Sequence, residues 1–131
     1  MTDKRRSAGS SFERWCAAWL ENEKWCVHRC GRKAMMIGPG KLVTAGNDIF
    51  GADLIAVRPG EKTLFVQATL DSSTGKRLEE FKKYSWNLEH QQVELWQKKE
   101  SGVVCQRFNG AEFAEVGRII RGKFYALGKE K

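Results

Sequence analysis

Apolar residues recur along the chain with two different periods, which predicts both helices and strands. A capping box at residues 10–13 precedes apolar positions at helical spacing, so we expect a helix over residues 10–23. Residues 24–30 (KWCVHRC) are typical of a strand. The glycine-rich residues 31–46 predict a loop or an irregular hairpin.

Two strands joined by a tight turn are predicted in the middle of the chain. Residues 52–57 (ADLIAV) and 63–69 (TLFVQAT) are rich in apolar residues, and Pro and Gly mark the turn between them. Side chains two positions apart share one face of a strand, so Gln67 and Thr69 are expected to emerge together. Pairing across the turn is expected to bring them near Asp53.

The second half of the chain also contains both predicted helices and predicted strands. A helix is expected over residues 76–86, and strands are expected over residues 92–97 and 103–108. Residues 113–120 have the spacing of a short helix, whereas residues 123–127 suit a strand or a tail. This order of elements predicts one mixed sheet with helices packed against it.

Length and composition indicate a single soluble domain. The chain has 131 residues, 41% of them hydrophobic, and no apolar run approaches a membrane span, so no membrane partner is expected. Residues 1–9 predict a flexible basic arm, and residues 10–131 predict the domain. The basic N-terminus leads into no hydrophobic segment, which argues against a secretory signal and favours the cytoplasm.

The net charge of +7, from 23 Lys and Arg against 16 Asp and Glu, favours a polyanionic partner. The positive excess lies in residues 1–40 and 101–131, whereas residues 41–71 carry a slight negative excess. Basic flanks around a central site suit phosphate binding. Ordinary solvated surface explains the same distribution equally well.

Cys26, His28 and Cys30 alternate along a predicted strand, in the manner of metal ligands on one face. Their spacing matches no usual zinc motif and sets the three ligands nearly in line, so partly buried strand residues are the favoured interpretation. Without an export signal, reduced thiols are expected.

Asp53 is the residue that most needs an explanation, because a carboxylate inside an apolar strand is costly unless it is compensated. A divalent metal is one compensation. A salt bridge or a cap at the strand end is the other, and both remain open.

The order of elements, with the segments SAGSSFERW, GNDIFGADLIAV and LFVQATL, resembles the PD-(D/E)XK nuclease superfamily over roughly residues 7–97. Within it, the chain is most similar to the archaeal-type Holliday junction resolvases and their phage-encoded relatives. The resemblance implies an α/β fold, a restriction-endonuclease-like mixed β-sheet flanked by α-helices in a single domain.

The resemblance also implies a magnesium site, at which Mn²⁺ can substitute for Mg²⁺. Asp53 is then the central ligand, and the side-chain oxygen of Gln67, the carbonyl of Ala68 and Glu13 are further ligands. Asp48 is implied to assist or to hold its loop. Oxygen ligands of this kind are those that Mg²⁺ prefers.

Two positions depart from the family pattern. Gln67 stands where the second acid is usual, and Thr69 stands where the family has a lysine that acts on the water or the transition state. Lys76 or Lys62 is the candidate to supply the missing charge. The expected catalytic residues are therefore Glu13, Asp53, Gln67, Thr69 and Lys76.

The implied function is a structure-selective, metal-dependent endonuclease that cleaves branched DNA as a homodimer, one site for each of two strands of a four-way junction. If the chain is phage-encoded, it acts in the host cytoplasm. The candidates for contacts with the DNA backbone are Arg14, Arg32, Lys33, Lys41, Lys76 and Arg77. Two alternatives remain: a nucleic-acid-binding protein without catalysis, and a nuclease acting on linear duplex DNA.

Overall fold

The computed structural model describes residues 2–30, 33–38, 41–45, 49–70 and 74–127. Within this part of the chain there are two helices and nine strands. Their bounds are α1 Thr2–Asn22, β1 Cys26–Arg29, β2 Lys33–Gly38, β3 Lys41–Ala45, β4 Leu54–Val57, β5 Thr63–Thr69, α2 Gly75–Lys82, β6 Gln91–Lys99, β7 Gly102–Phe108, β8 Phe113–Ile120 and β9 Lys123–Ala126. None of the described helices is both long and apolar enough to cross a membrane.

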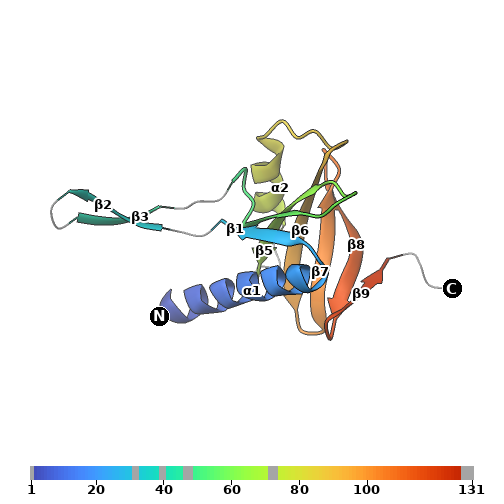
Figure 1. Cartoon of the computed structure of the whole chain (residues 1–131), viewed down its shortest axis with the longest axis horizontal. Coiled ribbons are helices and arrows are strands. Elements are labelled where there is room, and N and C mark those ends of the chain that lie inside the picture. Colours follow the sequence, from blue (N-terminus) through green and yellow to red (C-terminus); the bar gives the residue numbers. More distant parts are fainter. Residues whose placement is uncertain (1, 31–32, 39–40, 46–48, 71–73, 128–131) are drawn as a thin grey trace.

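Seven of the strands form one curled sheet in the order β1-β4-β5-β6-β7-β8-β9, and β2 and β3 form a separate hairpin (Figure 1). Neighbouring strands are antiparallel except β5 and β6, which are parallel. Helix α2 lies between β5 and β6 in the chain. The segment that contains it returns the chain to the end of the sheet where β5 began, as a parallel pair of strands requires.

The two helices pack against opposite faces of this sheet. Cys16 and Leu20 of α1 are fully buried in a cluster that reaches from β4 to β8. Phe81 of α2 is buried in a second cluster with Phe65 of β5 and Phe108 of β7. Because alternate residues of β5 contribute to the two clusters, its whole length is nearly covered.

The predicted fold class, a restriction-endonuclease-like α/β sheet flanked by helices, is wrong. The chain is mainly a seven-stranded sheet that curls into a half-barrel, with only two helices in the described residues. The error arises at residues 113–120, which form strand β8 and not a helix. A register shift between β7 and β8 leaves Val116 as an extra residue, and this bulge breaks the period of two and gives the helix-like spacing.

Other predictions are closer to the structure. The order of elements is confirmed from the first helix to residue 108, and the irregular hairpin expected within residues 31–46 is found as β2 and β3. Helix α1 already includes residues 2–9, where a flexible arm was expected. Helix α2 ends at Lys82, before Trp86, whose indole N–H donates to the carbonyl of Phe81 at 3.0 Å.

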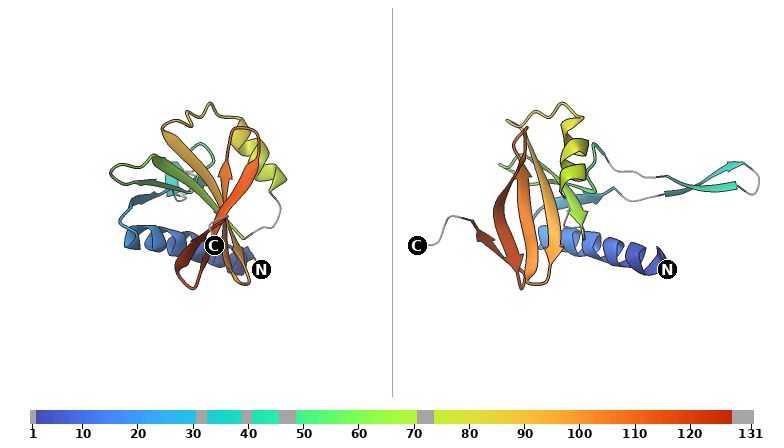
Figure 2. Two further views of the ribbon diagram at one scale, coloured as in Figure 1. Left: turned by 90° about the vertical axis from the view of Figure 1, so that its right-hand side faces the viewer. Right: turned by 180° about the vertical axis from the view of Figure 1, so that it is seen from behind.

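One end of the sheet gathers several chain segments. Strand β1 ends, β4 begins and β5 ends there, as the pairings Arg29 with Leu54 and Leu54 with Val66 require. The N-terminal half of α1 and the β2–β3 hairpin both project away from the sheet in the same direction (Figures 1 and 2). The sequence puts basic residues on both projections, including Lys4, Arg5, Lys33 and Lys41.

Candidate functional site

Asp53 lies at the bend that leads into β4, and its backbone is fixed on both sides. Its N–H donates to the carbonyl of Val66 at 2.8 Å, and its carbonyl accepts from the N–H of Cys30 at 2.7 Å. Its Oδ2 atom accepts a hydrogen bond from the N–H of Ala68 at 3.0 Å. The half-buried carboxylate therefore lies against β5, beside the residue that follows Gln67.

Gln67 is half-buried on β5, and its side-chain oxygen is the unusual atom of this region. Oε1 is fully buried, and no donor in the described residues hydrogen-bonds to it. A buried acceptor left in this state costs about 1–3 kcal/mol, so such atoms usually mark a site for water or an ion. An orphaned amide oxygen next to a carboxylate fits a hard cation such as Mg²⁺.

Glu13 lies on α1, on the face of the sheet opposite to α2 and to the side chains of Gln67 and Thr69. Its half-buried carboxylate lies 3.8 Å from the guanidinium of Arg29, the last residue of β1. Burial raises the pKa of the neighbouring Cys16 thiol well above its ordinary value, and the negative charges of Glu13 and then Asp53 raise it further. Both carboxylates thus act on the same thiol, one from the helix and one from the sheet.

Thr69 is buried at the end of β5, and Arg77 of α2 reaches it. The Nη2 atom of Arg77 donates to Thr69 Oγ1 at 3.0 Å. A guanidinium therefore lies at the strand position where the nuclease family has a lysine. From the sequence, Arg77 is predicted only to contact the DNA backbone. The one feature of the sequence that favours its contact with Thr69 is the predicted helix that begins shortly after the strand.

The structure separates the two lysines expected to replace the missing charge: Lys76 lies next to Arg77 on α2, whereas Lys62 precedes β5. Lys76 is exposed on the first turn of α2. Lys62 precedes β5, and its Nζ donates to the carbonyl of Leu88 at 2.7 Å. Because β5 has seven residues, Lys62 is separated from Thr69 by about 23 Å along the strand. The structure does not bring Lys62 to the site.

The remaining candidates divide into three groups. Asp48 and Arg32 lie outside the described residues. Lys33 and Lys41 belong to the projecting hairpin, and Arg14 is exposed on α1. Within the described residues no group of three or more His, Cys, Asp and Glu side chains could hold a metal, so a cation at Asp53 needs amide or carbonyl oxygens as well.

A third carboxylate, Glu94 of β6, is buried and was not anticipated from the sequence. It accepts hydrogen bonds from Gln92 at 2.7 Å and from the Trp96 indole at 2.8 Å. The Arg107 guanidinium lies 3.0 Å away on the neighbouring strand β7. Since both carboxylate oxygens are bonded, Glu94 has the environment of a structural residue that holds β6 to β7.

One carboxylate, an orphaned amide oxygen and a guanidinium thus come from the entry to β4, β5 and α2, whereas the Glu13 carboxylate lies on the α1 face. Asp53, Gln67 and Arg77 are groups that can bind a cation and an anionic group that accompanies it. Comparisons of the chain with protein-family models, with curated proteins and with solved structures give no match.

Proposed function

We propose that this protein is a metal-dependent endonuclease that cleaves branched DNA, with Asp53 and Gln67 as the centre of its metal site. The observation that carries the proposal is the buried Oε1 of Gln67, which has no donor in the described residues and lies one residue from the N–H that binds the Asp53 carboxylate. A cation accounts for both the orphaned oxygen and the carboxylate.

Asp53 and Gln67 would hold the ion, with the carbonyl of Ala68 as a further oxygen. Glu13, on the opposite face of the sheet from Gln67, is not part of this ligand set. Mg²⁺ or Mn²⁺ supplies Lewis-acid stabilisation of the charge that develops on a phosphodiester during hydrolysis. Arg77 contributes a fixed positive charge beside Thr69, which orients its guanidinium through the hydrogen bond at 3.0 Å. An arginine in this position binds phosphate oxygens and remains charged at every working pH.

The charge of the molecule supports DNA as the substrate. The net charge is +7, and basic residues occur on the two elements that project past the site. Arg14, Lys33, Lys41 and Lys76 are suited to contacts with phosphates, which fix position without reading sequence. Recognition of branched DNA by shape follows from such contacts.

A homodimer is part of the proposal, because a four-way junction is nearly two-fold symmetric. Strand β9 lies at the edge of the sheet and carries exposed apolar residues, Phe124, Tyr125 and Leu127 lying on it or just after it. An apolar sheet edge is a ready surface for a second copy.

A non-catalytic nucleic-acid-binding protein is the second candidate. Thr69 in place of a lysine and Gln67 in place of an acid favour it, because both changes reduce the charge available for chemistry. A nuclease that cuts linear duplex DNA is the third candidate.

One assay separates the three candidates. The protein is incubated with a four-way junction and with linear duplex of the same sequence, in Mg²⁺, Mn²⁺ or EDTA. We expect cleavage of the junction only with metal, and loss of at least about a hundredfold in rate for Asp53→Asn because the central ligand charge is removed. Asparagine keeps an oxygen that can accept from Ala68, so this variant is expected to fold.

Each contrary result has a clear meaning. Binding of the junction without cleavage in either metal supports the second candidate. Equal cleavage of junction and linear duplex supports the third. Full activity of Asp53→Asn contradicts the metal site itself.

A further inference from the structure

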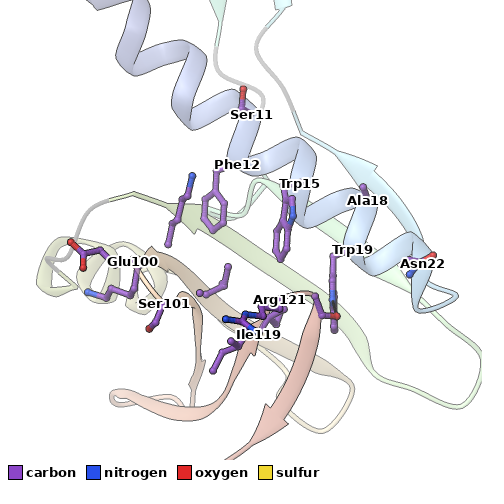
Figure 3. A pocket seen from close by; sticks show the side chains of 16 residues that line it. Ser11, Phe12, Trp15, Ala18, Trp19, Asn22, Glu100, Ser101, Ile119 and Arg121 are labelled. Atoms are coloured by element: carbon purple, nitrogen blue, oxygen red, sulfur yellow. Dashed lines mark hydrogen bonds between the residues drawn. The ribbon is translucent and has the colours of Figure 1, made fainter.

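An open groove of about 1160 Å³ lies between α1 and the β6–β7 and β8–β9 turns. Figure 3 shows Phe12, Trp15 and Trp19 pointing from one side of α1 toward the strand ends, with Ile119 and Arg121 opposite them. Trp15 is 40% exposed although it is a large aromatic side chain. Its ring is nearly parallel to that of Phe12, at an angle of 17°. The floor of the groove is therefore aromatic and open to a ligand.

Positive charge surrounds this aromatic floor. Lys98, Lys99 and Arg121 line the groove and are exposed. None of the three forms an ion pair with another described residue, and Glu100 is the single acid among the lining residues. An unpaired cationic rim around aromatic rings complements an anionic ligand with flat apolar groups.

The backbone at Arg121 adds a second indication. Arg121 and Gly122 form the two-residue turn between β8 and β9, with φ of 53° and 81°. Asparagine or glycine adopts such a conformation more readily than arginine. The Trp19 indole donates to the carbonyl of Gly122 at 2.8 Å, which holds the turn against α1. A poorly suited residue at a fixed turn on the rim indicates that its side chain has a role there.

We propose that this groove binds a single-stranded nucleic-acid segment, with a base stacked on Trp15 and phosphates at Lys98, Lys99 and Arg121. Bases of a duplex are stacked on each other and leave no face for Trp15, whereas unpaired bases stack on aromatic side chains whatever their sequence. An uncharged peptide would cover the rings but leave three cations unused.

The groove lies at the end of the sheet where β5 ends, because Lys98 directly follows Gln97, whose register partner on β5 is Thr69. The inference rests on the proposed function only in requiring a nucleic-acid substrate, since stacking needs neither metal nor cleavage.

The test is binding of a fluorescent oligothymidylate of about ten nucleotides, measured by anisotropy in EDTA with the full-length protein. We expect Trp15→Ala to weaken binding roughly tenfold, because the loss of one stacked base has about this effect. Trp15→Phe should retain most of the affinity, and Trp15→Leu should not, because only phenylalanine keeps an aromatic face. Glu112→Gln, on the exposed β7–β8 turn, should bind as the unchanged protein does.

Charge variants give an independent readout that does not depend on Trp15. Removing Lys98 and Lys99 together should reduce the salt dependence of binding. The slope of the logarithm of the binding constant against the logarithm of the salt concentration should become less steep by about 0.7 for each phosphate that is no longer neutralised. The matched control removes Lys82 and Lys83, the last residue of α2 and its C-cap, on the opposite face of the sheet, and should change nothing. Arg121→Asn should weaken binding while thermal stability stays equal or rises.

Two results overturn the proposal. One is unchanged oligonucleotide affinity in Trp15→Ala, Arg121→Asn and the Lys98 and Lys99 double variant. The other is self-association that Trp15→Ala abolishes while affinity stays the same, which assigns the groove to a second copy. If the oligonucleotide binds at the groove but the junction is not cleaved, only the proposed nuclease function is contradicted. If the junction is cleaved but the groove variants bind the oligonucleotide normally, only the groove proposal is contradicted.

Discussion

At the scale of single residues, the two central oxygen atoms of the candidate site differ in their hydrogen bonding. The Asp53 carboxylate has a donor in the N–H of Ala68, whereas Oε1 of Gln67 is buried without a donor in the described residues. The sequence predicted these two residues on paired strands, because two apolar segments flank a turn that contains Pro and Gly. It could not reveal the orphaned oxygen, because the burial of one atom depends on packing by α2 and neighbouring strands.

Gln67→Met should therefore have opposite effects on stability and activity. Methionine has nearly the same size but no buried acceptor, so we expect the free energy of unfolding to rise by about 1 kcal/mol. Metal-dependent cleavage should fall at the same time. Urea unfolding in EDTA and the junction assay measure the two effects, and a stability loss would show that Oε1 has a partner within the protein.

The buried thiols give a pH dependence of stability. Burial first, then negative neighbours, raises the pKa of Cys16 and of Cys105 above the ordinary 9.0. Above about pH 9 the unfolded chain loses these protons while the folded state keeps them, so stability falls as the pH rises. Each thiol contributes at most about 1.4 kcal/mol per pH unit.

Urea unfolding at pH 8 and pH 10 tests this statement. Other groups titrate over the same range, so the informative quantity is the difference between the unchanged protein and Cys16→Ala. The variant should lose less stability between the two pH values. An identical loss in both proteins would mean that the Cys16 thiol ionises normally in the folded state.

At the scale of elements, β9 pairs with β8 at the edge of the sheet, and the two strands approach closely at Gly117. Gly117 of β8 is buried, and a side-chain carbon there would collide with the ring of Phe124. The strand β8 was missed from the sequence because its bulge at Val116 imitates helical spacing. By contrast, α1, β4 and β5 were located because their apolar periods are uninterrupted.

Gly117→Ala should destabilise the protein by about 1–3 kcal/mol, since either β9 or the Phe124 ring must move. Gly75→Ala is the matched control, because nothing lies within 4 Å of the added carbon at the start of α2. Urea unfolding of both variants gives the comparison. If both changes are equally harmless, the close packing of β9 against β8 does not contribute to stability.

At the scale of the whole molecule, the candidate site lies where β4 begins and β5 ends, with α2 beside it, and the basic projections extend from this end of the sheet. The sequence predicted that Gln67 and Thr69 lie near Asp53, because two strands joined by a tight turn pair with each other. The contact from Arg77 to Thr69 could not be predicted, since it depends on how α2 returns over the sheet. The fold class was wrong because β8 and β9 continue the sheet into a half-barrel, where a short helix followed by a strand or a tail was expected.

Divalent-metal binding tests the central claim most directly, because it needs neither a DNA substrate nor a dimer. Mn²⁺ titrated into the protein can be followed by calorimetry, beside Asp53→Asn, Gln67→Met and, as a control, Glu112→Gln on the exposed β7–β8 turn. We expect a site that is lost in Asp53→Asn, weakened in Gln67→Met and unchanged in Glu112→Gln. Equal binding in all four proteins, or no binding in any, would contradict a metal site at Asp53 and Gln67.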